Sequence, residues 1–283
     1  MSYLEIKNIT KTFGDTVALD KVSLNLEQNK IYGLLGRNGA GKTTLLNLIT
    51  NRLFPTEGEI TVDGDSVIEN DSPLSKIYYM TEKNYYPENM TVKKAFTWSR
   101  EFYPNFDREY AHGLCEKFQL KTGKKLKALS TGYQSIFKIV VALACNAPLI
   151  LLDEPVLGLD ANHRDMFYKE LVKNYSENPR TIIISTHLIE EAAEIIEDVI
   201  VIKAGRVLMQ DSAENILSQG YAVSGTAAAV DSYIKGRNVL SIDVLGGLKT
   251  AYLMEKAGQA GIPAGLEVSK LDLQKLFIHL TNS

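Results

Sequence analysis

A glycine-rich octapeptide, GRNGAGKT at residues 36–43, constrains the fold of this chain more than any other feature. It matches the pattern GxxxxGK[ST] and lies between a dense apolar run at residues 31–35 and a helix-periodic segment at residues 44–53. A buried strand, such a loop and a following helix together form a cradle in which backbone N–H groups bind phosphate. The sequence therefore predicts an α/β core that binds a nucleoside phosphate at a strand-to-helix turn.

Each part of this loop has a role in that prediction. Glycines let the backbone fold around phosphate oxygens, and the N-terminal end of the following helix adds positive charge. Lys42 is a point charge for the outer phosphates, and the Thr43 hydroxyl is a ligand for Mg²⁺. The predicted nucleotide-binding residues of the loop are Gly36, Asn38, Gly39, Ala40, Gly41, Lys42, Thr43 and Thr44.

A second motif ends another apolar run. Residues 149–152 are all apolar and are followed by two carboxylates, Asp153 and Glu154. Sheets of this type bind ligands at the carboxyl ends of their strands. We expect Asp153 to hold Mg²⁺, through water, and Glu154 to polarise the attacking water as a general base. Alone, this pair is equally consistent with a solvated strand end, but together with the phosphate loop it predicts nucleotide hydrolysis.

The hydrophobic pattern divides the chain into regions. Runs at residues 4–6, 17–19 and 22–26 predict antiparallel strands, and residues 85–145 carry helical periodicity. Strands and helices alternate again up to residue 202, with helices expected at 165–175 and 188–196. We predict an α/β phosphate-loop NTPase core with an N-terminal antiparallel β-subdomain, a helical insertion and a small α+β C-terminal accessory domain. The nucleotide-hydrolysing domain is expected at 1–210, its helical subdomain at about 85–145, and the accessory domain at 211–283.

Composition narrows the range of partners. The chain has 34 acidic and 31 basic residues, a balance that gives no support for a nucleic-acid partner. It has no apolar stretch of membrane-spanning length, and residues 1–7 lack a signal-peptide pattern. We therefore expect a cytoplasmic chain that needs a separate partner for any work at a membrane. Cys115 and Cys145 lie in apolar helical contexts and are expected to be buried, and the histidines lack metal-ligand spacing.

A third motif indicates a family. The sequence LSTGYQ at residues 129–134 resembles the LSGGQ signature of ABC ATPases, and the order and spacing of motifs resemble that family over about residues 3–210. Further positions are similar to family motifs: residues 158–160 to the D-loop, His187 to the switch histidine, Phe13 to the aromatic residue that stacks on adenine, and Glu82 to the glutamine of the Q-loop.

The resemblance implies a mechanism that uses two ATPase domains. They meet head to tail around two ATP molecules, and opening and closing of this dimer drives an integral membrane subunit at the cytoplasmic face of the cell membrane. Ser130 and Gly132 are then expected to contact the ATP of the opposite subunit, and Glu82 to ligate metal or water. The residues implied to act on the chain's own ATP are Phe13, Lys42, Thr43, Asp153, Glu154 and His187. Asp160 of the D-loop is a further predicted nucleotide-binding residue.

The signature departs from the family pattern at three positions. Thr131 replaces the first glycine of the pair, Tyr133 replaces the usual glutamine, and Ser135 stands where an arginine is common. The two residues implied to contact ATP, Ser130 and Gly132, are retained. We therefore expect a working but slower site.

Several of these residues also fit simpler interpretations. Phe13 is either the adenine-stacking residue or a core aromatic, and Asp160 is a D-loop residue, a helix N-cap or both. A group of aromatic residues either lines a docking groove for a cytoplasmic helix of the membrane subunit or packs the helical insertion. If it lines the groove, a Tyr86→Asp change should uncouple transport from ATP hydrolysis. The group comprises Tyr85, Tyr86, Trp98, Phe102 and Tyr103.

The resemblance favours a transporter ATPase over two alternatives. Glu82, the altered signature and the segment 271–281 resemble export ATPases of the bacitracin-resistance type, which implies export of a peptide, an antibiotic or another amphipathic molecule. A soluble ABC ATPase that regulates ribosomes or DNA is the alternative, but such proteins usually carry two ATPase domains or a long coiled coil. A phosphate-loop kinase would not account for residues 129–134 or His187. The second ATPase subunit is either a copy of this chain or a related one.

Overall fold

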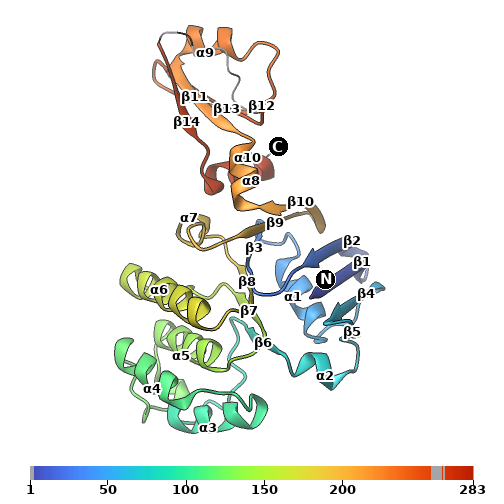
Figure 1. The fold of residues 1–283 in the computed structure, drawn as a ribbon, viewed down its shortest axis with the longest axis vertical. Helices are drawn as coiled ribbons and strands as arrows, with labels where there is room; N and C mark the ends of the chain where they lie inside the picture. The colour runs from blue at the N-terminus through green and yellow to red at the C-terminus, as the bar shows by residue number, and fades with distance from the viewer. Residues whose placement is uncertain (1–2, 256–262, 264, 283) are drawn as a thin grey trace.

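The computed structural model describes residues 3–255, 263 and 265–282. Residues 1 and 2 of the expected ATPase domain and residues 256–262, 264 and 283 of the expected accessory domain lie outside the described residues. The described residues form three sheets with helices packed around them (Figure 1). Among these residues, no helix combines the length and the apolar character needed to cross a bilayer.

The first sheet is antiparallel, with the strand order β2-β1-β4-β5. Its strands are β1 (Leu4–Phe13), β2 (Thr16–Leu26), β4 (Glu57–Val62) and β5 (Asp65–Ser66). Burial alternates along β2, as expected for a sheet with one solvated face. The two strands predicted at 17–19 and 22–26 are in fact one. The pattern is interrupted because the register shifts between residues 19 and 22, where Lys21 has a φ of 49°.

The second sheet carries the functional edge of the molecule. Its order is β10-β9-β3-β8-β7-β6, and its pairs are parallel except that of β10 with β9. Every residue of β3, β7 and β8 is buried, which explains their continuous apolar sequences. The strands are β3 (Ile31–Leu35), β6 (Ile77–Met80), β7 (Leu149–Asp153), β8 (Thr181–Ser185), β9 (Asp198–Lys203) and β10 (Arg206–Ser212).

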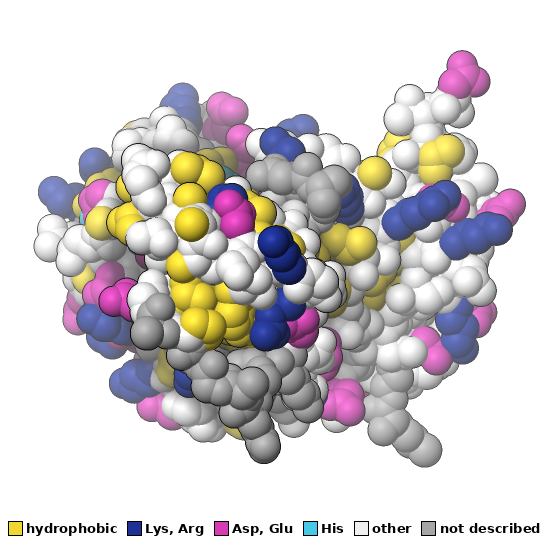
Figure 2. All heavy atoms as spheres, turned by 90° about the horizontal axis from the view of Figure 1, so that it is seen from above, with side chains coloured by type: hydrophobic (Ala, Val, Ile, Leu, Met, Phe, Trp, Pro, Cys, Tyr) yellow, Lys and Arg dark blue, Asp and Glu magenta, His cyan; other side chains and the backbone are white. Residues whose placement is uncertain are grey.

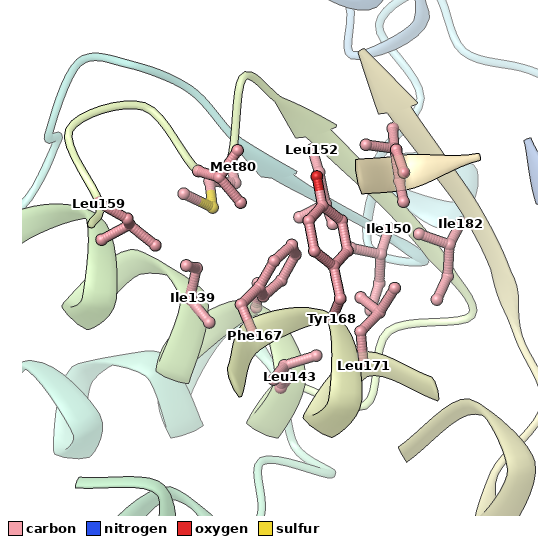
Figure 3. Close-up of a cluster of buried hydrophobic side chains, with 14 of the residues drawn as sticks. Met80, Ile139, Leu143, Ile150, Leu152, Leu159, Phe167, Tyr168, Leu171 and Ile182 are labelled. Atoms are coloured by element: carbon pink, nitrogen blue, oxygen red, sulfur yellow. The ribbon is translucent and has the colours of Figure 1, made fainter. Parts of the chain in front are cut away.

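Helices cover this sheet on both sides. On one side, α5 and α6 pack against β6, β7 and β8 through a continuous apolar core (Figure 3). Cys115 and Cys145 are buried in the same core, as expected. The helices are α1 (Lys42–Ile49), α2 (Asp71–Leu74), α3 (Val92–Phe102), α4 (Arg108–Lys117), the 3-10 turn η1 (Leu126–Ala128), α5 (Thr131–Ala144), α6 (Ala161–Glu177) and α7 (Ile189–Ala192).

Two helices are shorter than their apolar periodicity predicts. The helix expected to reach residue 53 ends at Ile49, because Asn51 adopts a left-handed conformation with a φ of 52°. The helix expected at 188–196 is limited to α7. Turn residues follow α7, and the backbone N–H of Glu197 donates to the Ile31 carbonyl at 2.9 Å just before β9 begins.

The third sheet has the order β12-β13-β11-β14 and forms the far end of the molecule (Figure 1). The boundary expected after residue 210 falls within β10 and stays a prediction. Seen from above, apolar side chains are visible on this end among polar and charged ones (Figure 2), and Leu245 is 84% exposed. The elements are α8 (Ala213–Ser218), β11 (Tyr221–Thr226), α9 (Ala227–Tyr233), β12 (Val239–Leu245), β13 (Leu248–Leu253), β14 (Leu266–Lys270) and α10 (Leu273–Asn282).

The predicted fold class is confirmed by this architecture. A mainly parallel sheet lies between helices, an antiparallel sheet precedes it, and the helices α3 to α5 are inserted between β6 and β7. Small strands and helices follow β10. The carboxyl ends of β3, β7 and β8 therefore lie along one edge of the central sheet, where the candidate site is found.

Candidate nucleotide-binding site

The loop between β3 and α1 folds tightly under the start of the helix. Gly41 is the N-cap of α1 and has a φ of 108°, a left-handed conformation that favours glycine. A Cβ atom at this position would lie 2.9 Å from the carbonyl oxygen of Ala18. Ala40 is buried and Asn38 is exposed. The loop thus presents backbone N–H groups at a helix N-terminus, which is the arrangement that binds phosphate.

Lys42 is held inside this loop and is only 7% exposed. Its Nζ donates to the carbonyl oxygen of Gly36 at 2.6 Å and to that of Arg37 at 3.4 Å. Burial lowers the pKa of Lys42, whereas the nearby carboxylates of Glu154 and Asp153 act in the opposite direction. The side chain is therefore enclosed by its own loop and placed at the anion-binding turn.

Asp153 closes the other side of the loop. Its Oδ2 accepts hydrogen bonds from the hydroxyl of Thr43 at 2.8 Å and from that of Tyr79 at 3.3 Å. Its Oδ1 is buried and has no hydrogen-bond partner. An uncommitted carboxylate oxygen beside a threonine hydroxyl fits the oxygen ligands of Mg²⁺.

The rest of the chain contributes little more to such a metal site. Within residues 3–255, 263 and 265–282, no three His, Cys, Asp or Glu side chains cluster in a way that could hold a metal ion. Mg²⁺ commonly uses one or two protein ligands together with substrate phosphates and water. The pair Thr43 and Asp153 therefore fits a magnesium ion that arrives with a nucleotide.

Glu154 and His187 form the next pair along the same edge. Glu154 has a φ of 50°, which is unusual for a residue with a side chain and costs about 1–2 kcal/mol. Its backbone N–H donates to the Ser185 carbonyl at 2.8 Å, so β8 fixes this turn. His187 Nδ1 lies 2.8 Å from Glu154 Oε2. When Nδ1 donates to this carboxylate, Nε2 is left free for another ligand.

Phe13 and Glu82 lie apart from these contacts. Phe13 is 47% exposed at the end of β1, with the Lys11 Nζ 5.0 Å from its ring centroid, so the core-aromatic interpretation is wrong. Glu82 follows β6 with an exposed side chain, and its carbonyl accepts a hydrogen bond from Lys138 at 2.8 Å. The residue after or within β6 that contacts Asp153 is Tyr79, not Glu82. The metal role of Glu82 stays a prediction.

The signature segment is at the start of α5. Ser130 is exposed and caps this helix, with its hydroxyl accepting from the Tyr133 N–H at 3.4 Å. A Cβ atom on Gly132 would lie 2.8 Å from the carbonyl oxygen of Gly158. The hydroxyl of Ser135 donates to the Leu157 carbonyl at 2.9 Å. Residues 157–158 thus hold the signature in place. Lys42 and Asp153, by contrast, are held by contacts with the phosphate loop.

Asp160 has the capping role that the sequence allowed for it. Its side chain caps α6 by accepting from the His163 N–H at 2.9 Å, and its Oδ2 also lies 2.9 Å from His163 Nδ1. These hydrogen bonds lower the pKa of Asp160. The His163 ring in turn lies 6.2 Å from the ring of Tyr133, in an edge-to-face arrangement. His163 therefore joins the D-loop to the altered signature.

Sequence reasoning missed three of these contacts: those of Tyr79, His163 and Ser135. The sequence patterns do not single out Tyr79 or His163, and they mark Ser135 only as a departure from the family. No signal in the sequence indicates them, because each contact joins residues from different elements. Only the aligned ends of β6 and β7 bring the Tyr79 hydroxyl to Asp153.

The aromatic group after β6 divides into two sets. Tyr86 and Tyr103 pack against the core, and the Tyr86 hydroxyl lies 2.8 Å from that of buried Ser99. Phe102 is 68% exposed, and Tyr85 and Trp98 are also exposed. All five residues line a groove of about 370 Å³. The groove and core-packing interpretations thus each hold for part of the group, and Tyr86→Asp would place a charge in the core.

Comparisons with known proteins agree with this geometry. A family model described as ABC transporter matches residues 19–157. The ABC transporter ATP-binding protein YtrB of Bacillus subtilis is 35% identical over 66% of this chain, and the alignment covers 64% of that protein. The bacitracin transport ATP-binding protein BcrA of Enterococcus faecalis is 31% identical, over 72% of this chain and 68% of that protein.

Solved structures give the same result. A dimeric ATP-binding cassette in a post-hydrolysis state, bound to ADP and phosphate, is 28% identical with a TM-score of 0.66. The superposition covers 74% of this chain and 98% of that cassette. An ATP-binding subunit of an ABC transporter has a TM-score of 0.69 at 22% identity, covering 76% of this chain and 92% of that subunit.

Proposed function

Because this chain belongs to the family of ABC transporter ATP-binding proteins and is an ABC-type ATPase, we propose that it powers a separate membrane-spanning subunit by binding and hydrolysing ATP at the edge of its central sheet. The observation that carries the proposal is the order of side chains along this edge. Lys42 lies in the phosphate loop, Asp153 lies beside Thr43, and Glu154 lies beside His187.

The chemistry follows from these contacts. Lys42 leaves the loop carbonyls to bind the outer phosphates of ATP, and Asn38, Ala40 and Thr44 contribute loop contacts. Glu154 accepts a proton from the attacking water as that water forms its bond to the γ-phosphorus, while the bond between the γ-phosphorus and the β,γ-bridging oxygen breaks and ADP leaves. His187, oriented by Glu154 through Nδ1, faces the γ-phosphate with Nε2. Phe13, exposed on β1, stacks on adenine.

Thr43 and Asp153 are the residues that would hold Mg²⁺, with Glu82 as a further oxygen ligand to the metal or its water. When bound, the ion neutralises charge on the outer phosphates. The buried Oδ1 of Asp153 supports this assignment, because a buried carboxylate oxygen without a partner is costly unless it binds a ligand.

A second ATPase chain, either a copy of this one or a related one, would complete the site. Ser130 and Gly132 lie at the start of α5 and are not buried, so they are free to face the ATP of an opposite subunit, where a helix N-terminus and a hydroxyl meet the γ-phosphate. The 28%-identical cassette that was solved as a dimer supports this arrangement. Asp160 lies at the same surface beside residues 157–158.

The exposed part of the aromatic groove is the proposed docking site for the membrane subunit. Trp98, Phe102 and Tyr85 are large, exposed and adjacent to β6, whose end leads into the nucleotide site. Exposed aromatic residues in a groove are typical anchors for a partner helix. The chain would then work at the cytoplasmic face of a membrane, held there by its partner.

The transported molecule is proposed to be a peptide, an antibiotic or another amphipathic compound that leaves the cell. The name of one relative supports export: a Nod factor export ATP-binding protein of Sinorhizobium fredii, which is 30% identical over 73% of this chain and 62% of that protein. The name of the bacitracin transport protein of Enterococcus faecalis supports an antibiotic as the transported molecule.

The test is co-purification from the native host. A tagged Glu154→Gln chain should retain ATP and, after gentle solubilisation of the membranes, bring down a polytopic membrane protein in stoichiometric amount. Adding Phe102→Asp should release that protein, whereas adding Leu245→Asp, which places the same charge at an exposed leucine on the third sheet, should not. Recovery of ribosomal or DNA-bound partners, with the chain absent from membranes, would instead establish a soluble regulatory ATPase.

A further inference from the structure

Arg52 lies between two tyrosine rings in the turn after α1. Its Cζ is 4.9 Å from the ring centroid of Tyr79 and 4.4 Å from that of Tyr85. Both distances are within the range of a cation–π interaction. Tyr79 is in β6, Tyr85 is in the following loop, and all three residues line the aromatic groove.

The first of these rings reaches the nucleotide site. The Tyr79 hydroxyl donates to Asp153 Oδ2, the oxygen that also accepts from Thr43. If the Thr43 hydroxyl turns toward a metal ion, Tyr79 is the donor that stays on Oδ2. A donor on the outer oxygen of a metal-binding carboxylate fixes the orientation of its other oxygen. Here that other oxygen is the buried Oδ1, which has no hydrogen-bond partner.

We propose that Tyr79 is a positioning residue for Asp153, and that Arg52 links this positioning to the aromatic groove through Tyr85. The inference rests on the proposed function, because it concerns how the same site binds a metal–nucleotide complex. Arg52 stacks on both rings, so a shift of Tyr85 in the groove moves the guanidinium against Tyr79. Linkage requires the converse as well: binding of the metal–nucleotide complex alters the groove.

The positioning role is tested by metal affinity. We would titrate Mn²⁺ into the full chain with a non-hydrolysable ATP analogue and follow binding by electron paramagnetic resonance. Tyr79→Phe keeps the ring and removes one hydrogen bond, so the affinity for Mn²⁺ should fall by about fivefold. Tyr103→Phe is the matched control, because its hydroxyl also lines the groove and donates at 3.3 Å, to the Ile77 carbonyl.

Each outcome of this titration has a distinct meaning. A fivefold loss in Tyr79→Phe alone, with thermal unfolding unchanged relative to Tyr103→Phe, supports the positioning role. Equal Mn²⁺ affinity in the wild type and Tyr79→Phe overturns it. If the wild-type chain itself binds neither Mn²⁺ nor the ATP analogue, the proposed function fails, and the failure is not specific to Tyr79.

The link to the groove is tested by fluorescence. Trp98 is the single tryptophan of the chain and lines the groove, so excitation at the red edge reports on the groove alone. The metal–nucleotide complex should change Trp98 emission in the wild type. Arg52→Met should abolish the change. Lys83→Met is the matched control, because Lys83 also lies near the Tyr85 ring, at 5.9 Å. Lys83 is not part of the proposed link to Tyr79, so this variant should retain the change.

Three results would count against the link, and the first two would overturn it. One is an unchanged Trp98 response in Arg52→Met. The other is the lack of any response in a wild-type chain that demonstrably binds the nucleotide. Loss of the response in both Arg52→Met and Lys83→Met would also count against Arg52, because it would assign the effect to the overall charge of the groove.

Discussion

The two halves of the proposed ATP site differ in how they are built. The half that serves the chain's own nucleotide is enclosed: Lys42 and Asp153 are each 7% exposed, and both are hydrogen-bonded within the loop and its neighbours. The signature half is open, because Ser130 is exposed and Gly132 is only partly covered. The enclosed half is therefore organised within a single chain. The open half is held in place by residues 157–158 and remains accessible to a second molecule.

The largest expected effect lies in the enclosed half. Glu154→Gln removes the proposed general base but keeps the side-chain shape, so ATP turnover should fall by about 10²–10⁴-fold while ATP affinity is kept. Steady-state turnover and equilibrium binding of ATP measure the two quantities. Glu194→Gln, an exposed glutamate beyond α7, should change neither. Comparable turnover in both variants would remove Glu154 from the mechanism.

Mixing two impaired chains would sharpen the comparison between the halves. Lys42→Ala damages the enclosed half and Ser130→Asp damages the open half, and each alone should lower turnover at least about tenfold. If copies pair, random mixing makes half of the dimers mixed, each with one intact composite site. Turnover should then recover to about a quarter of the wild-type value. A mixture no more active than its components would show that the halves do not meet between two copies.

Gly132 tests how the open half is positioned. Gly132→Ala places a Cβ atom 2.8 Å from the Gly158 carbonyl oxygen, so it should lower the free energy of unfolding by about 1–3 kcal/mol. Gly113→Ala has no neighbour within 4 Å in the middle of α4 and should instead stabilise the chain, by about 0.5–1 kcal/mol. Denaturant unfolding of both variants distinguishes close packing from a general intolerance of alanine.

The smallest expected effect separates two roles of Ser130. Ser130→Ala removes the N-cap of α5 and should cost about 1 kcal/mol of stability as well as reducing turnover. Ser130→Asp supplies another capping side chain, so stability should be kept, while its negative charge faces the γ-phosphate and turnover should fall further. If the two variants lose turnover in proportion to their stability, Ser130 acts only as a cap.

Much of the fold and of the enclosed half follows from local sequence. The phosphate loop and the strand ending at Asp153 are continuous segments, and each contains the strand, the turn and the reactive residue together. A local pattern therefore suffices to place Lys42, Thr43, Asp153 and Glu154 near one another, because parallel strands end at the same edge.

The remaining features depend on contacts between distant segments. Tyr79 reaches Asp153 only through the register of β6 and β7, and Gly132 is constrained by Gly158, which follows a different strand. The exposure of Phe13 likewise depends on where β1 ends relative to its neighbours. Hydrophobic periodicity also failed where the backbone changes direction, at the left-handed residues Lys21 and Asn51. Such positions carry no periodic signal.

The packing of α10 has a consequence for how the chain is made. Leu271, Leu273 and Leu276 belong to the large apolar cluster that also contains Ile189 and Ala192 of α7, and α10 contacts α7. A ribosome adds about 5–20 residues per second, so roughly 4–16 seconds separate the synthesis of α7 from that of α10. During this interval the surface that α10 covers is open to water and to other nascent chains. We therefore expect a chaperone to bind this surface while the chain is being made.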